Sequence, residues 1–137
     1  MRTFLSVAMI FLLCNFSAYA EAGSVIVGPG TDVNSLDANA IKRIFLGRES
    51  TLGAQPIVVV FQKSGSVRES FDNTVLGKPG SQLTSYWAKL VFTGKAKAPE
   101  ELASDAEVRA KVAATPGAIG YVDDGAVDAS VTKVFDF

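Results

Sequence analysis

Histidine is absent from this 137-residue sequence, and cysteine occurs once, as Cys14 near the amino terminus. Without histidine the chain cannot build a Ser-His-Asp or Cys-His catalytic arrangement, and beyond Cys14 it has no soft ligand for zinc. A single cysteine also excludes an internal disulfide. The adjacent acidic pairs Asp123-Asp124 and Glu100-Glu101 stand in turn-rich or helix-starting contexts, where solvated charges are expected. The composition therefore predicts no enzyme, no catalytic residue, no metal site and no cofactor.

Long apolar runs are confined to the amino terminus. Arg2 precedes the apolar segment Phe4 to Phe16, and Ala18-Tyr19-Ala20 has the small-x-small pattern that signal peptidase reads. The run is shorter than the roughly 20 apolar residues that a membrane-spanning helix needs. We therefore expect residues 1–20 to be a signal peptide cleaved after Ala20, with an uncleaved amino-terminal anchor as the alternative.

Charge of neither sign dominates the remainder. Without Arg2, residues 21–137 carry 12 basic and 14 acidic side chains, a formal net charge of -2. This balance argues against a nucleic-acid partner, because binding to nucleic acid relies on cationic contacts to phosphate. The 117 residues of this segment fit one compact domain and are too few for two. We predict a single domain over residues 21–137.

Apolar patterning indicates four strands in this domain. A short buried strand is expected at residues 24–27, before Gly28-Pro29-Gly30. The unbroken apolar run Pro56 to Phe61 is typical of a strand covered on both faces, and we predict that it is the central strand. Two more strands are expected at residues 118–122 and 131–135.

Helical spacing marks four helices between these strands. The helices are expected at about residues 36–45, 67–75, 81–93 and 105–114, with glycine after the first three and a Ser104 to Glu107 capping box before the last. Phe45, Phe71 and Trp87 lie on the apolar stripes, which predicts that they are core residues. The order of elements predicts an α/β fold with helices packed on a small mixed sheet.

The turn after the Val-rich strand carries the most informative chemistry. Ser64, Gly65 and Ser66 lie between this strand and the next helix, and Arg68 follows in the first helical turn. Unpaired backbone N–H groups and the partial positive charge at a helix start favour an anion there, and serine hydroxyls and a guanidinium add donors. We predict that these four residues bind a tetrahedral oxyanion. A simpler alternative is that Ser66 caps its helix and Arg68 is a solvated charge.

Three motifs resemble the periplasmic phosphate-binding proteins of the PstS type. They are Ile44-Phe45-Leu46-Gly47-Arg48, the strand that ends in Ser64-Gly65-Ser66 before Phe71, and Ile119-Gly120-Tyr121-Val122. The match covers only the second lobe of a family whose members normally have two. The resemblance implies one half of a type II periplasmic binding protein, in the periplasm, with Ser64, Gly65 and Ser66 at the phosphate-holding positions. Val60 stands where the family places an arginine, and Arg68 is its candidate substitute.

Two functions follow as hypotheses from the resemblance. The first is a solute-binding protein for inorganic phosphate or a related oxyanion, linked to phosphate ABC transport, in which a membrane permease, a second copy or an envelope protein is the partner. The second is an interaction or structural component of an envelope assembly that has lost ligand binding. The substitution at Val60 and the missing lobe motivate the second hypothesis.

Overall fold

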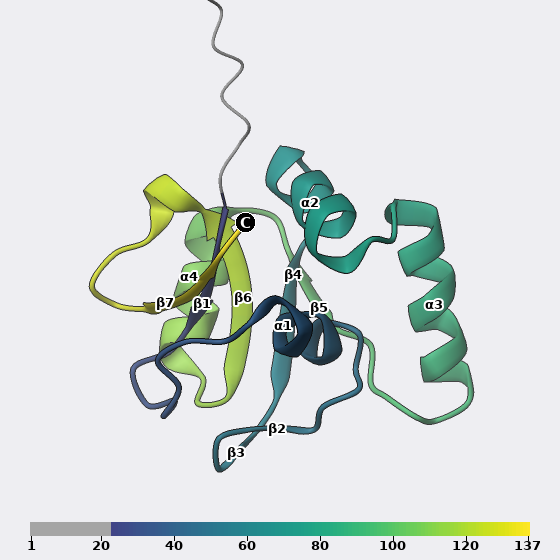
Figure 1. The fold of residues 1–137 in the computed structure, drawn as a ribbon, viewed down its shortest axis with the longest axis horizontal. Helices are drawn as coiled ribbons and strands as arrows, with labels where there is room; N and C mark the ends of the chain where they lie inside the picture. Colours follow the sequence, from purple (N-terminus) through teal and green to yellow (C-terminus); the bar gives the residue numbers. More distant parts are fainter. Residues whose placement is uncertain (1–22) are drawn as a thin grey trace, which may run out of the picture.

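The protein, described here over residues 23–137 from a computed structural model, is organised around a five-stranded mixed sheet in the order β5-β4-β6-β1-β7 (Figure 1). β4 pairs in parallel with β5 and β6, whereas β1 pairs antiparallel with β6 and β7. The strands are β1 (Gly23–Val27), β4 (Val58–Gln62), β5 (Glu100–Leu102), β6 (Ala118–Asp123) and β7 (Thr132–Asp136), and a separate two-stranded ribbon joins β2 (Thr51–Leu52) to β3 (Gln55–Pro56).

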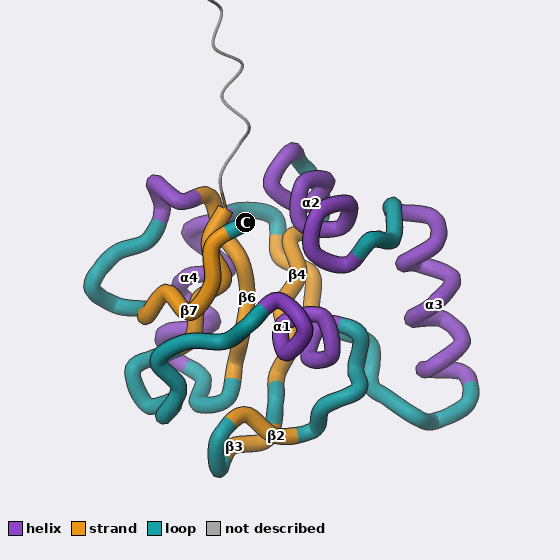
Figure 2. The backbone as a smooth tube through the Cα atoms, in the orientation of Figure 1, coloured by secondary structure: helices purple, strands orange, loops and turns teal. Residues whose placement is uncertain are grey.

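Helices cover both faces of the sheet (Figure 2). One face carries α1 (Ala38–Phe45), α2 (Ser66–Phe71), the π-helix η1 (Asp72–Leu76) and α3 (Gly80–Phe92); the other carries α4 (Asp105–Ala114), and a short 3-10 helix, η2 (Asp124–Ala126), follows β6. Neighbouring strand residues alternate between the two layers, so that Phe61 packs with the first group and Val60 with α4. The predicted α/β fold class and the burial of Phe45, Phe71 and Trp87 are confirmed.

Helix caps follow the sequence closely. Asp37 caps α1 by accepting a hydrogen bond from the Ala40 N–H, at 2.7 Å. Ser104 caps α4 by accepting from the Glu107 N–H at 3.2 Å, while the Glu107 carboxylate accepts from the Ala103 N–H at 2.9 Å. These short polar side chains satisfy donors that the helix itself cannot pair, and the predicted capping box from Ser104 to Glu107 is confirmed, whereas α1 begins two residues later than predicted.

Three predictions about the strands need correction. β4 is not the central strand, because β1 and β7 extend the sheet beyond β6 and leave β6 in the middle. The predicted strand from Pro56 to Phe61 is divided, since Pro56 ends β3 and β4 begins at Val58. Glu100 and Glu101 belong to neither a loop nor a helix start, because they form β5 beside Val60 and Phe61.

The two ends of the described lobe lie side by side. Gly23 and Phe137 exchange both backbone hydrogen bonds at 3.0 Å, and Figure 1 shows the carboxyl terminus next to the beginning of β1. Between residues 23 and 137 no helix is long and apolar enough to cross a membrane. The predicted signal peptide, residues 1–20, lies outside the described residues.

Candidate functional site

The turn from Lys63 to Gly65 joins the carboxyl end of β4 to the start of α2. Gly65 occupies the cap position with φ of 109°, a conformation that residues with a Cβ rarely adopt, and no side chain caps the helix start. A Cβ at Gly65 would meet no atom of the described residues within 4 Å, so among these residues the space against the backbone is open. Since Gly65 and not Ser66 is the cap, the structure does not use Ser66 in the simpler capping role. The first N–H groups of a helix have no acceptor within the helix itself, which makes a helix start a place where an acceptor from outside can bind.

Arg68 links the first turn of α2 to β4. Its Nη1 donates to the Gln62 carbonyl at 2.6 Å, which ties the first turn of α2 to the last residue of β4. Nε lies 3.0 Å from a carboxylate oxygen of Asp72, and Nη1 lies 3.0 Å from one of Glu101. The guanidinium also stands over the Phe61 ring, 5.1 Å from its centroid. Two of the three guanidinium nitrogens therefore hold protein groups, and only Nη2 makes no hydrogen bond to a described residue.

The charges around Arg68 do not balance, because one guanidinium serves two carboxylates. Burial alone would lower the pKa of Arg68, but its hydrogen bonds to Glu101 and Asp72 outweigh burial and raise that pKa. Burial raises the pKa of Asp72 despite its bond to Arg68, since the Asp72 side chain is 4% exposed and Oδ1 has no hydrogen-bond partner among the described residues. Burial also raises the pKa of Tyr121, whose hydroxyl accepts from the Gln62 N–H at 3.2 Å.

Asp72 is expected to titrate above its ordinary value of 3.8, whereas Asp124 is expected to titrate below it. Hydrogen bonding from the Ser24 hydroxyl and the charge of Lys133 lower the pKa of Asp124. Carbon-13 shifts of the two carboxyl groups against pH measure both midpoints. Because the folded state keeps the Asp72 proton to higher pH than the unfolded chain, the contribution of Asp72 to stability falls as pH rises from 3.8 through its folded pKa. A midpoint for Asp72 at or below that of Asp124 would contradict this assignment.

A cavity of about 550 Å³, here called the turn cavity, opens beside the turn and brings together most of the predicted site. Ser64, Gly65 and Arg68 line it, together with Lys63 and Asp72. Ser66 is the first residue of α2 and is not part of that lining. Glu69 and Glu101 also border the space, so that its wall holds three carboxylates and two cations. Val60, at the position where the resemblance expects an arginine, is buried against α4 on the opposite side of the sheet.

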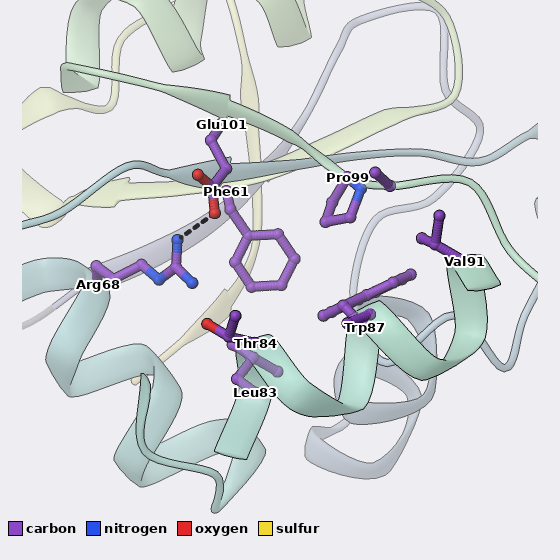
Figure 3. A pocket seen from close by; sticks show the side chains of 10 residues that line it. Phe61, Arg68, Leu83, Thr84, Trp87, Val91, Pro99 and Glu101 are labelled. Atoms are coloured by element: carbon purple, nitrogen blue, oxygen red, sulfur yellow. Dashed lines mark hydrogen bonds and ion pairs between the residues drawn. The ribbon is translucent and has the colours of Figure 1, made fainter. Parts of the chain in front are cut away.

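A second cavity, about 450 Å³ and here called the apolar cavity, lies between α3 and the segment that leads into β5 (Figure 3). Phe61, Trp87, Val91 and Pro99 form its walls. In Figure 3 Arg68 points into one end of this space, with its bond to Glu101 drawn above the Phe61 ring.

Glu101 is a residue of the candidate site that the sequence does not reveal. Its interpretation as a solvated charge is corrected, because its carboxylate binds Arg68 and borders both cavities even though the side chain is 47% exposed. No sequence signal reports a pair of residues 33 positions apart. Among residues 23–137, no three His, Cys, Asp or Glu side chains are grouped so that they could hold a metal ion.

Comparison with solved structures shows the fold that this geometry belongs to. An ABC-type phosphate transport receptor from Vibrio cholerae superposes with a TM-score of 0.66 at 20% identity, over 82% of this chain and 45% of the receptor. PstS from Borrelia burgdorferi gives 0.65 at 15% identity, over 82% and 46%. A Clostridium perfringens protein crystallised with bound phosphate gives 0.66 at 24% identity, over 82% and 44%. The chain therefore spans less than half the length of these structures and shares the fold of one part of each.

The sequence itself matches a known domain family. No curated protein matches the chain. The family described as the PBP superfamily domain matches over residues 18–135, which is most of the sequence. This match agrees with the phosphate-binding-protein-like fold. The chain belongs to the PBP superfamily domain family.

Proposed function

We propose that this lobe is a solute-binding protein that holds phosphate or a similar oxyanion at the turn formed by Ser64, Gly65 and Ser66, and that it serves phosphate uptake through an ABC transporter. The observation that carries the proposal is the helix start at Gly65, which no described side chain caps, with a cavity of about 550 Å³ beside it. Backbone N–H groups at such a start bind anions, and serine hydroxyls add donors. Membership of the PBP superfamily and the phosphate-binding descriptions of the structural neighbours support the same ligand class.

The charges of the turn cavity favour an oxyanion that carries a proton. Carboxylates can only accept hydrogen bonds, and three of them face two cations around this space. Hydrogen phosphate can donate its proton to a carboxylate such as Glu69 or Glu101, whereas sulfate has no proton to donate and meets only repulsion there. We therefore expect phosphate to bind more tightly than sulfate at this turn.

A partner surface is expected to complete the site. The turn cavity is open on one side, and an anion that faces water gains less from charged hydrogen bonds because solvent and salt screen them. A second copy of the chain, a transporter permease or another envelope protein could close over the ligand, as the neighbours of twice the length suggest.

In keeping with this role we propose that residues 1–20 are cleaved after Ala20 and that residues 21–137 form the single exported domain. A mass beginning at Met1 in protein recovered from the periplasm would contradict the cleavage.

Replacement of Ser64 by alanine is expected to weaken phosphate binding about tenfold to a hundredfold, because a hydrogen bond to a charged ligand is worth about 1.5–3 kcal/mol. Isothermal titration of phosphate at constant ionic strength measures the loss. Ser85→Ala is the matched control, because Ser85 is exposed on α3 and borders neither cavity, and it should bind like the wild type.

The absence of any binding signal in the wild-type titration would favour the alternative function, an interaction or structural component of an envelope assembly. If millimolar phosphate, sulfate and related oxyanions produce neither heat nor a change in melting temperature, the turn does not bind an anion in the isolated lobe. The engagement of Arg68 by two carboxylates is the observation that favours this alternative, an interaction module of an envelope assembly. Equal affinity of the Ser64→Ala and Ser85→Ala variants would place the anion elsewhere.

A further inference from the structure

We infer that the oxyanion held at the turn carries an apolar group, and that the apolar cavity between α3 and β5 receives that group. The inference rests on the proposed function, because the turn is expected to hold the anionic end of the molecule. Its first support is the position of the two cavities, which share Arg68, Thr84 and Glu101 as a common wall. The two cavities are therefore adjacent, and we expect the apolar group of a ligand held at the turn to extend across this wall.

The lining of the apolar cavity determines what it accepts. Phe61, Trp87, Val91 and Pro99 present rings and aliphatic groups, and the only charged side chains in the lining are Arg68 and Glu101. Its volume of about 450 Å³ lies in the range of small-molecule sites. An aromatic ring or a branched alkyl group would exchange water for apolar contacts there.

Arg68 connects the polar and apolar parts. Nε and Nη1 are taken by protein acceptors, but Nη2 donates to no described residue, and in Figure 3 the guanidinium points into the cavity between Phe61 and Thr84. A ligand that crosses this wall would meet a free N–H donor at the point where its apolar group joins its anionic group. Glu101, which lines both cavities at this wall, is 47% exposed.

The shape of the cavity follows from the way α3 is attached. Only Leu83 and Trp87 of α3 are buried, while Val91 is 42% exposed and Phe92 is 93% exposed. Tyr86 and Leu90 are partly buried against the same core, and the space between the helix and Pro99 is left unfilled. A small apolar group fits this space without any displacement of the core.

The experiment compares phenylphosphonate with methylphosphonate, which have the same anionic head and differ in the apolar group. Burial of the phenyl ring should make phenylphosphonate bind about tenfold to a hundredfold more tightly in calorimetric titrations. Trp87 is the only tryptophan of the chain, so its emission reports directly on the apolar cavity. Excited where phenylphosphonate does not absorb, the emission should change with phenylphosphonate and stay constant with methylphosphonate.

A pair of neighbouring substitutions tests the location. Val91→Asp places a carboxylate in the lining of the apolar cavity, whereas Phe92→Asp places one on the adjacent, solvent-facing position of the same helix. Val91→Asp should abolish the advantage of phenylphosphonate over methylphosphonate, and Phe92→Asp should preserve it.

The possible results separate the two proposals. If neither phosphonate nor phosphate binds, the proposed function fails and this inference fails with it. If both phosphonates bind with equal affinity and only Ser64→Ala weakens them, the oxyanion site stands and the apolar group has no place in it. If phenylphosphonate binds but benzyl alcohol displaces it and Ser64→Ala has no effect, the cavity is an independent apolar site and the inference is overturned.

Discussion

Arg68→Ala is expected to lower the free energy of unfolding by about 3–5 kcal/mol, because it strips a buried carboxylate of its counter-charge. Asp72 is 4% exposed and Arg68 is 14% exposed, so solvent screens their pair only weakly. The substitution also removes the bond from Nη1 to the Gln62 carbonyl, which holds the turn to β4. Urea unfolding of the variant and the wild type measures the loss.

Arg43→Ala is the control for this prediction. Arg43 and Glu49 also form a pair at 3.0 Å, but both side chains are exposed to a large extent, and such pairs contribute between 0 and about 1 kcal/mol. The double substitution Arg68→Met with Asp72→Leu should recover most of the stability, because apolar residues of similar size replace a buried pair with little or no loss. A loss for Arg68→Ala no larger than for Arg43→Ala would show that the Arg68 network contributes little.

This prediction affects how ligand binding is tested. A loss of phosphate binding in Arg68→Ala would not assign Arg68 as a ligand, because the same substitution loosens the turn that presents Ser64 and Gly65. Substitutions of the serines leave that attachment intact. The role of Arg68 toward an anion therefore stays a prediction that only its remaining Nη2 could fulfil.

Phe71→Ala is expected to destabilise the lobe by about 3–5 kcal/mol, the usual range for an aromatic residue removed from a core. Phe71 is fully buried at the end of α2 and stacks on Tyr121 of β6, with ring centroids 4.1 Å apart and an interplanar angle of 14°. Its ring also contacts Phe45 edge-on at 4.7 Å. Since these rings attach α2 to the sheet, the cavity left by alanine would weaken the support of the turn.

Phe92→Ala provides the matched control, since Phe92 is 93% exposed at the end of α3. Removal of that ring should change the unfolding free energy by no more than about 0.5 kcal/mol. If Phe71→Ala prevents folding altogether, Phe71→Leu gives a smaller loss that urea unfolding can still measure. Similar losses for Phe71→Ala and Phe92→Ala would mean that the aromatic cluster does not anchor α2.

Elements with strong local signals could be predicted from the sequence. The caps at Asp37 and Ser104 are set by residues three positions apart, and the glycines after α1 and α3 end those helices where the pattern says they should. The alternation of Val60 and Phe61 between two hydrophobic layers follows from the geometry of a strand that is covered on both faces. In these cases the information needed lies within a few residues.

Features that depend on distant partners could not be predicted. β5 contains two glutamates and forms because its backbone pairs with β4, so neither propensity nor alternation marks it. The central place of β6 follows from strands β1 and β7, which come from opposite ends of the chain. Of the two carboxylate partners of Arg68, Asp72 lies four residues ahead and could have been recognised from helical spacing, whereas Glu101 comes next to it only through the fold. The apolar cavity likewise depends on how far α3 stands from the sheet.

Because Gly23 and Phe137 pair through reciprocal hydrogen bonds, the described domain begins and ends at the same place on its surface. A module of this kind can be spliced into a surface loop of another protein, or rewired so that it starts and stops elsewhere, with little disturbance of its sheet. New ends could be opened near Lys97, an exposed position between α3 and β5, once a short linker joins the old ones. Two domains of this type could therefore be joined by one linker, and each would keep its own core.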